Sequence, residues 1–340
     1  MFARFLSVGA LILGLAVPAH AEDDPSVDAG SALSVSTSAS SLPTTEVLSN
    51  VAQVPTDSSG DTAIDATVGG VDIKVPTDPS NPVSFESSTG NVISIELPFA
   101  NAAANARVVT QGVVAYDNNN ASETIPVVKE DGSLQITSVI WSSTAPSAYT
   151  YTFEIPEGAT LLIQENGAAT ILGQDGSFLG VIAPAWALDA EGVSVPTHYE
   201  LTGSTLTQVV DHTSSDFSYP IVADPWLGID LISSFKWVSS SQGRTISVAV
   251  TPMMGFVAEA IAAGPGWDEL VTKVSRTGKS NLDRLRTVPM QQQWACHAAG
   301  KTLIGIAGWL GIDKRPTWDL ETWLRPVSDP WVMVSKKCNW

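Results

Sequence analysis

The sequence predicts an all-β amino-terminal module, an antiparallel sandwich or barrel, followed by a small disulfide-closed α+β domain. Residues 61–225 consist of short β-prone runs separated by turn residues, without a credible helix between them. Residues 22–225 hold three Lys and Arg against 26 Asp and Glu, whereas residues 226–340 hold 13 against nine. Nine of the 11 Trp also follow this join. An acidic, Trp-poor part and a basic, Trp-rich part indicate two modules.

The amino terminus has the features of a secretory signal peptide. Arg4 supplies a positive first region, residues 5–17 are apolar, and Ala19-His20-Ala21 is a small-x-small cleavage site. We therefore assign residues 1–21 to the signal and expect a secreted, extracellular protein, associated with the cell surface. The alternative is a retained anchor. The apolar run is shorter than the roughly 20 residues that a spanning helix needs, and no later segment reaches that length.

Residues 22–60 are rich in Ser, Thr, Ala, Asp and Pro and lack both a sustained period and an aromatic residue. Such a composition buries too little apolar surface to offset the entropy of ordering, so this segment is expected to be disordered. A stalk and a tolerated tail are both compatible with it.

Residues 61–225 are expected to form the acidic β-sandwich module. Alternation is clearest in the run from residue 71 to 75, and Lys129-Glu130-Asp131-Gly132 has the composition of a hairpin turn. The predicted strands are Val71–Val75, Val92–Leu97, Arg107–Tyr116, Thr124–Val128, Ser133–Trp141, Tyr149–Ile155, Thr160–Gln164, Ala169–Leu172, Phe178–Ile182, Thr197–Leu201 and Leu206–Asp211.

Residues 226–340 are expected to form the basic Trp-rich α+β domain. The only two cysteines, Cys296 and Cys338, predict a disulfide in an exported chain, which stabilises by about 4 kcal/mol through loop closure. The predicted elements are a hairpin of Phe235–Val238 and Thr245–Thr251, helices at Phe256–Ala263, from Trp267 and at Met290–Ile312, a turn at Leu320–Leu324 and a strand at Trp331–Val334.

Several kinds of chemistry find little support. A mature net charge of −19 argues against nucleic acid as a partner, and no cofactor motif is present. Cys296 and His297 are neighbours, which point about 100° apart in a helix, and a metal site would need further ligands. A hydrolase is suggested by Asp211-His212, as part of a catalytic triad, and by the carboxylates of Asp189 and Glu191, as in a glycosidase. No Gly-x-Ser-x-Gly nucleophile elbow supports the triad. We therefore favour a protein without enzymatic activity.

The tryptophans of the basic part have two interpretations. Packing in the core is one of them. The other is a surface that meets a membrane or a cell-wall polymer, because Trp beside cations favours an interface with one wet and one apolar side. The candidate residues for such a surface are Trp318, Trp323, Arg325, Trp331, Lys336, Lys337 and Trp340.

The basic part contains Gln293-x-x-Cys296-His297, Trp318-x-Leu320-Glu321 with Arg325-Pro326, and Cys338-Asn339. In these residues it resembles a carboxy-terminal family of unknown function found in exported proteins of Gram-positive actinobacteria. The join Tyr219-Pro220-x-Val222-Ala223-Asp224-Pro225 also belongs to this resemblance. The acidic part looks like a leader module of similar exported proteins. The resemblance implies an exported location and a domain boundary, but no activity.

Three functions remain open at this level. In the first, the chain is a proprotein whose acidic module contacts and masks a cationic domain that acts on cell envelopes, with Ala223, Asp224 and Pro225 as the processing region. In the second, an uncleaved cell-surface protein binds wall polymer or carbohydrate. A hydrolase built on His198 and His212 is the third. The charge asymmetry between the two parts motivates the first function.

Overall fold

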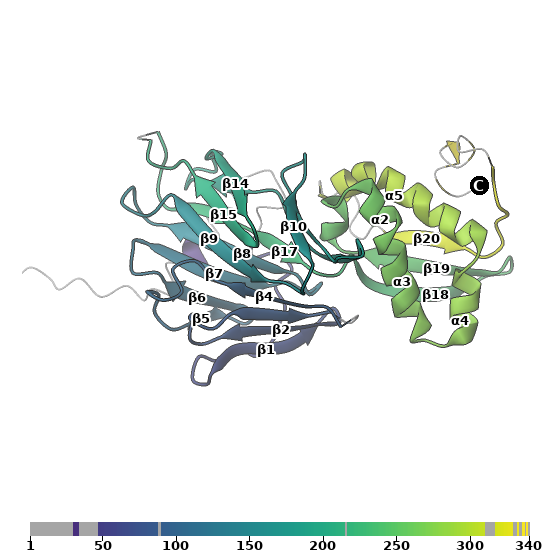
Figure 1. Ribbon diagram of the computed structural model, residues 1–340, viewed down its shortest axis with the longest axis horizontal. Coiled ribbons are helices and arrows are strands. Elements are labelled where there is room, and N and C mark those ends of the chain that lie inside the picture. Colours follow the sequence, from purple (N-terminus) through teal and green to yellow (C-terminus); the bar gives the residue numbers. More distant parts are fainter. Residues whose placement is uncertain are drawn as a thin grey trace, which may run out of the picture.

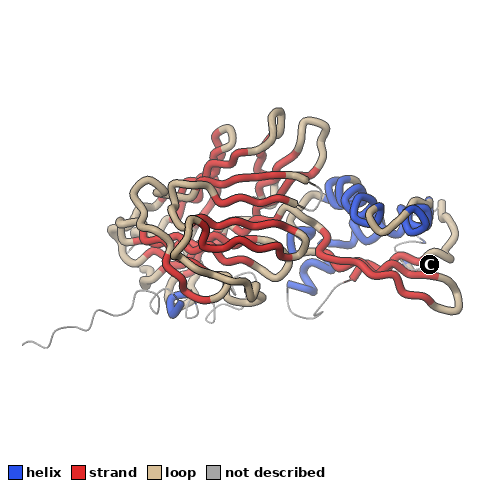
Figure 2. The backbone as a smooth tube through the Cα atoms, turned by 90° about the horizontal axis from the view of Figure 1, so that it is seen from below, coloured by secondary structure: helices blue, strands red, loops and turns tan. Residues whose placement is uncertain are grey.

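The computed structural model describes residues 30–33, 47–87, 90–214, 216–309 and 317–328, together with residues 332, 335, 336 and 338. Two large β-sheets pack face to face, and a smaller unit of helices and three strands lies beside them (Figure 1). Apart from residues 30–33, the helices of the described chain gather in the smaller unit (Figure 2). The predicted order, an all-β module followed by an α+β domain, is confirmed.

The first large sheet has seven antiparallel strands in the order β1-β2-β3-β4-β9-β15-β14. Side chains alternate between core and solvent: in β2, Val71, Ile73 and Val75 are buried, while Asp72 and Lys74 are exposed. The strands are β1 (Thr62–Val68), β2 (Val71–Pro76), β3 (Val83–Glu86), β4 (Val92–Glu96), β9 (Ala148–Glu154), β14 (Thr197–Thr202) and β15 (Thr205–Val210).

The second large sheet has ten strands, and its path runs β10-β11-β12-β17-β8-β7-β6-β5, with β16 beside β8 and β13 beside β16. Every residue of β7 and β8 is buried, because both faces of this sheet are covered. The strands are β5 (Arg107–Thr110), β6 (Val113–Asp117), β7 (Ser122–Val128), β8 (Leu134–Ile140), β10 (Thr160–Ile163), β11 (Ala169–Leu172), β12 (Phe178–Ile182), β13 (Trp186–Leu188), β16 (Ile221–Asp224) and β17 (Trp226–Gly228).

The amino-terminal segment covers the outer face of the ten-stranded sheet. Leu33 and Val47 are fully buried there against residues such as Val127, and the amide of Ala52 donates to the carbonyl of Val128 at 2.9 Å. The prediction of disorder over residues 22–60 is therefore wrong for the described residues 30–33 and 47–60. Their few apolar side chains cannot form a hydrophobic core by themselves. They become buried because they pack against apolar residues of the ten-stranded sheet.

Strands β10, β11 and β12 form a meander with a nine-residue period. Gly158, Gly167 and Gly176 each precede a strand by two residues, with φ of 78°, 83° and 79°. Glycine adopts this left-handed conformation without a steric penalty, so each of these positions forms a tight turn. One set of the meander's apolar side chains, which includes Leu161 and Ile171, packs in the core between the large sheets. Another set, Ala168, Phe178 and Val181, contacts the smaller unit.

The smaller unit is a three-stranded antiparallel sheet covered by helices. The turn predicted at Leu320–Leu324 is present only at Thr322 and Trp323, because Leu320 and Glu321 lie in a strand that pairs with β19. The predicted strand at Trp331–Val334 lies largely outside the described residues. The elements are β18 (Ile232–Ser239), β19 (Arg244–Val250), β20 (Thr317–Glu321), the 3-10 helix η2 (Pro252–Gly255), α2 (Glu259–Ala263), α3 (Pro265–Ser275), α4 (Lys279–Leu285) and α5 (Val288–Trp309).

The two units share a continuous apolar seam. Phe178 and Val181 of β12 belong to the same buried cluster as Met253, Met254 and the helix residues of the smaller unit. A Cβ on Gly228 would come within 2.3 Å of Cγ of Met253, so this close packing requires glycine. The predicted domain boundary at 225/226 is displaced, because β17 pairs with β12 and β8 and belongs to the large sheet.

Candidate functional site

Gln293 and His297 are one helical turn apart on α5, and both reach the backbone of β20. The Gln293 side chain donates to the carbonyl of Glu321 at 3.1 Å and accepts from the amide of Glu321 at 2.7 Å. Nε2 of His297 lies 3.3 Å from the carbonyl oxygen of Asp319. The stretches around Gln293 and around Leu320, on which the family resemblance rests, are therefore hydrogen-bonded to each other in the folded chain.

Gln292 fixes the segment that follows β20. Its side-chain amide donates to the carbonyl of Val327 at 2.7 Å and accepts from the amide of Val327 at 3.0 Å. Together with Gln293, it anchors both ends of the loop from residue 321 to 327. Trp323 and Arg325 lie between these two anchors and are thereby held in place.

The disulfide predicted between Cys296 and Cys338 is present. It occupies the sulfur of Cys296, so this residue does not act as a thiol nucleophile beside His297. Burial lowers the pKa of His297, and the imidazole stacks on Trp318 with 5.5 Å between ring centroids. Within the described residues, no group of three or more His, Cys, Asp or Glu is arranged to hold a metal.

Trp318 belongs to the core and not to a binding surface, which corrects the sequence interpretation. It is 1% exposed and packs on Trp294, whose ring centroid is 4.7 Å away and which in turn contacts Trp267. Trp323 is half-buried, whereas Arg325 and Lys336 are exposed. The other candidates, Trp331, Lys337 and Trp340, lie outside the described residues.

A cluster of aromatic and cationic side chains lies near the β18–β19 hairpin end, which is the end of the small sheet away from the large sheets (Figure 1). The guanidinium of Arg244 lies over the Trp237 ring, 5.4 Å from its centroid. A Cβ on Gly243 would come within 2.9 Å of the Trp323 ring, and the amide of Arg244 donates to the hydroxyl of Thr322. We call Trp237, Arg244 and Trp323, together with Arg325 two residues further along the anchored loop, the hairpin-tip cluster.

Two donors in the hairpin-tip cluster lack a hydrogen-bond partner in the described structure. They are Nε1 of Trp237 and Nε of Arg244, and both atoms are buried. An unpaired buried donor costs about 1–3 kcal/mol, so these two atoms, like Nε1 of the core residue Trp318, call for an explanation. Trp323 and Arg325 are candidates from the sequence alone, whereas Trp237 and Arg244 are not, because only the β18–β19 pairing brings those two together.

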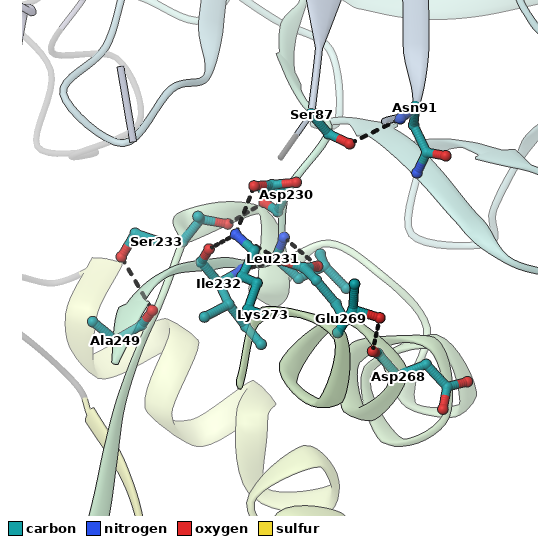
Figure 3. Close-up of polar contacts among 12 residues, drawn as sticks. Ser87, Asn91, Asp230, Leu231, Ile232, Ser233, Ala249, Asp268, Glu269 and Lys273 are labelled. Carbon is teal, nitrogen blue, oxygen red and sulfur yellow. Dashed lines mark hydrogen bonds and ion pairs between the residues drawn. The ribbon is translucent and has the colours of Figure 1, made fainter. Parts of the chain in front are cut away.

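A buried charge cluster lies where the chain passes from β17 to β18. Lys273 of α3 lies between two carboxylates, 2.6 Å from Asp230 and 3.2 Å from Glu269 (Figure 3). Glu269 also accepts the amides of Leu231 and Ile232 at 2.9 and 3.0 Å. Burial, together with the charge of Asp230, raises the pKa of Glu269 to about 7. The cluster fixes the first residues of β18 to α3.

The candidate processing region lies inside the large sheet. Ala223, Asp224 and Pro225 are all buried, and β16 pairs with β13 on one side and β8 on the other. Burial raises the pKa of Asp224 well above its usual value, against the opposing effects of a hydrogen bond from Gln135 and the charge of Lys129. A protease would have to open the sheet to reach this stretch.

The residues considered for hydrolysis are not brought together. His198 is exposed on β14, 3.6 Å from Glu200. His212 is buried, and its ring nitrogens contact the hydroxyl of Tyr219 and the carbonyl of Pro146. The Asp189 carboxylate accepts three backbone amides, which is a loop-stabilising role.

Comparison with known families concerns the smaller unit. Residues 232–340 match a family described as a protein of unknown function, DUF2599, and the match begins at the first residue of β18. The expected carboxy-terminal domain of unknown function is thereby confirmed, while the actinobacterial origin and the individual motifs stay predictions. No curated protein matches the chain. In the described part, no helix combines the length and the apolar character needed to cross a membrane.

Proposed function

We propose that this protein is exported and acts uncleaved as a receptor for an anionic polymer of the cell envelope. The hairpin-tip cluster would be the binding site. The observation that carries this proposal is the pair of buried, unpartnered donors on Trp237 and Arg244, next to the half-buried Trp323. Oxygen atoms of a ligand would supply the acceptors that the described structure lacks.

The residue types of the hairpin-tip cluster suit an anionic saccharide polymer. Indole faces stack on the apolar faces of sugar rings, and a guanidinium pairs with carboxylate or phosphate oxygens in a bidentate geometry. The anchoring of residues 321–327 by Gln292 and Gln293 supports the same proposal. A loop that is already ordered loses little conformational entropy when it binds.

The seam between the units favours an uncleaved protein over a proprotein. Separation would expose Phe178, Val181 and Met253 to water, in addition to unpairing β16 or β17. Burial of each large apolar side chain contributes about 1.5–3 kcal/mol, so the two units stabilise each other. A masked domain that is released by cleavage near Asp224 fits this arrangement poorly.

Retention on isolated Gram-positive cell walls tests the proposal. We expect the full-length chain to be retained at low salt and released at high salt, because screening weakens exposed charge pairs. The double variant Trp323→Ala/Arg325→Glu should lose affinity by about tenfold or more, as expected for an aromatic and a cationic contact.

The matched control is Lys74→Glu, which makes the same charge change on an exposed strand of the large sheet. It should be retained like the unaltered protein. Flow-through of the unaltered protein at low salt would contradict the proposal. Equal losses in both variants would show that net charge alone, and not the hairpin-tip cluster, governs binding.

A further inference from the structure

A groove separates the two units along the start of β18. It has a volume of about 280 Å³ and is lined by Gly69 and Gly70 on one side and by residues 233–235, Lys273 and Arg276 on the other. The glycine wall is bare backbone: a Cβ on Gly69 would come within 2.4 Å of the carbonyl oxygen of Asp131. Clefts between domains are frequent ligand sites, and this one lies away from the hairpin-tip cluster.

Beyond the groove, β18 continues as the outer edge of the small sheet. In the described part of the chain, β18 pairs with β19 alone and is the edge of its sheet. The eight residues of β18 contain neither Pro nor Gly, and Lys236 is the single charged side chain among them. An edge of this kind presents backbone donors and acceptors that can pair with another strand.

Among the described residues, Lys273 and Arg276 line the groove, and no carboxylate residue lines it. The ammonium of Lys273 already contacts Asp230, Glu269 and the carbonyl of Ile232, which takes up its three donors. Arg276 is exposed, and it lines the groove together with Ser234. With Lys236 further along the strand, the charge of this edge is complementary to that of an acidic partner.

We propose that the outer edge of β18 binds an extended acidic peptide, which adds to the small sheet as a fourth strand. A carboxylate of the peptide pairs with Arg276 in the groove, while backbone hydrogen bonds form along residues 234–239. Ile232 takes no part in this ladder, because its amide and carbonyl already bond to Glu269 and Lys273. Strand addition of this type obtains affinity from main-chain bonds and specificity from side-chain contacts. Phe235, which is half-buried at the groove, adds an apolar contact to the bound peptide.

The probe is a fluorescein-labelled peptide as long as β18, of alternating valine and threonine with one central glutamate. Fluorescence polarisation with the full-length chain should show saturable binding. A peptide with lysine in place of glutamate should bind about tenfold more weakly, corresponding to one charge-assisted contact. A version with N-methyl groups along one edge should not bind, because it cannot form the ladder.

Two protein variants separate the groove from general charge. Arg276→Glu should reverse the preference between the glutamate and lysine peptides. Arg284→Glu makes the same charge change on α4, where Arg284 donates to Ser280, and should keep the original preference. Hydrogen exchange should slow, when the glutamate peptide binds, at those amides of residues 234–239 that do not bond to β19.

Equal binding of both peptides, binding that survives N-methylation, or an unchanged exchange rate would overturn the proposal. Absence of saturable binding by the glutamate peptide would also overturn it. These outcomes are independent of cell-wall retention, because the variants of that experiment lie at the hairpin-tip cluster. Failure of one proposal therefore leaves the other intact.

Discussion

At the scale of single residues, Glu269 shows how burial changes an ordinary carboxylate. It shares Lys273 with Asp230, so two carboxylates compete for one ammonium in a region with little water. The folded chain therefore holds a proton on Glu269 more strongly than the unfolded chain does, and the pKa rises to about 7 from 4.5. Proton binding at this residue stabilises the folded state.

Stability should decrease as the pH rises through this interval. The contribution of Glu269 is complete below about pH 4.5 and is lost as the pH passes through about 7, because the folded-state pKa is the higher one. The loss is on the order of 1–3 kcal/mol. Glu269→Gln mimics the protonated form, so its free energy of unfolding should vary less between pH 5 and pH 8, as measured by urea denaturation.

Asp268→Asn is the control for this experiment. Asp268 precedes Glu269 on α3 and is exposed, so its replacement should leave the pH dependence unchanged. Equal pH dependence in Glu269→Gln and in the unaltered protein would contradict the assignment of the proton to this residue.

At the scale of elements, α5 acts as the support of β20 and of the loop after it. Three consecutive glutamines begin this contact, but they differ in role. Gln291 is exposed, Gln292 bonds to Val327 and Gln293 is fully buried against Glu321. Helical geometry separates neighbours by about 100°, which gives three identical side chains different environments.

Gln293→Ala should destabilise the small sheet. It removes the two hydrogen bonds to the amide and carbonyl of Glu321 and a third to the carbonyl of Pro289, which costs about 1–3 kcal/mol. The midpoint of urea unfolding measures this loss. Gln291→Ala is the matched control, because the same change at an exposed helix position should have little effect or stabilise slightly. Similar midpoints for the two variants would contradict the supporting role of Gln293.

At the scale of the whole molecule, the two units form one folded body with unequal charge. Residues 22–225 are strongly acidic and residues 226–340 are mildly basic, yet the seam between them is apolar. Asn166 of the meander donates to the carbonyl of Phe256. The rings of Trp226 and Phe256 pack edge to face, with 6.4 Å between their centroids. Apolar burial, not charge attraction, is the main contribution to their association.

This arrangement predicts a single exported species. Intact mass and amino-terminal sequencing of protein from culture medium should find a chain that begins near Glu22, with no fragment that begins between residues 223 and 226. The reason is the burial of β16 between two neighbouring strands. A fragment that begins at this stretch would contradict both the prediction and the uncleaved receptor.

Limited digestion with proteinase K provides the control. The exposed turn at residues 239–242 should be cut early, whereas residues 221–228, of which only Trp226 is not fully buried, should resist. Early cleavage in the second stretch would show that the sheet opens readily there.

The prediction from sequence was most successful where the pattern is local. Alternation in the strand at Val71 and the helix from Met290 both depend on neighbours in the chain, and the structure contains both elements. The strands β1, β3, β13, β16 and β17 were not predicted, and the run Arg107–Tyr116, predicted as one strand, is the hairpin of β5 and β6. Most of the missed strands are short and are defined by their partners. The packed segment around Val47 was missed for the same reason.

The hairpin-tip cluster was only partly within reach of the sequence. Trp323 and Arg325 were noticed because they combine an aromatic residue with a nearby charge. Trp237 and Arg244 gain significance only when β18 and β19 pair and place a guanidinium over an indole. Trp318 also has cationic residues close by in the sequence, as Trp323 does, but its side chain is buried in the core.

By itself, the sequence determined the order of an all-β module and an α+β domain, the charge asymmetry between them and the cysteine pair. These properties follow from composition, from local periodicity and from the fact that the chain contains only two cysteines. Tertiary structure alone decided which tryptophans are buried, that β16 is protected, and that the two units share a core. Those outcomes depend on contacts between residues far apart in the chain, which the spacing along a single sequence does not specify.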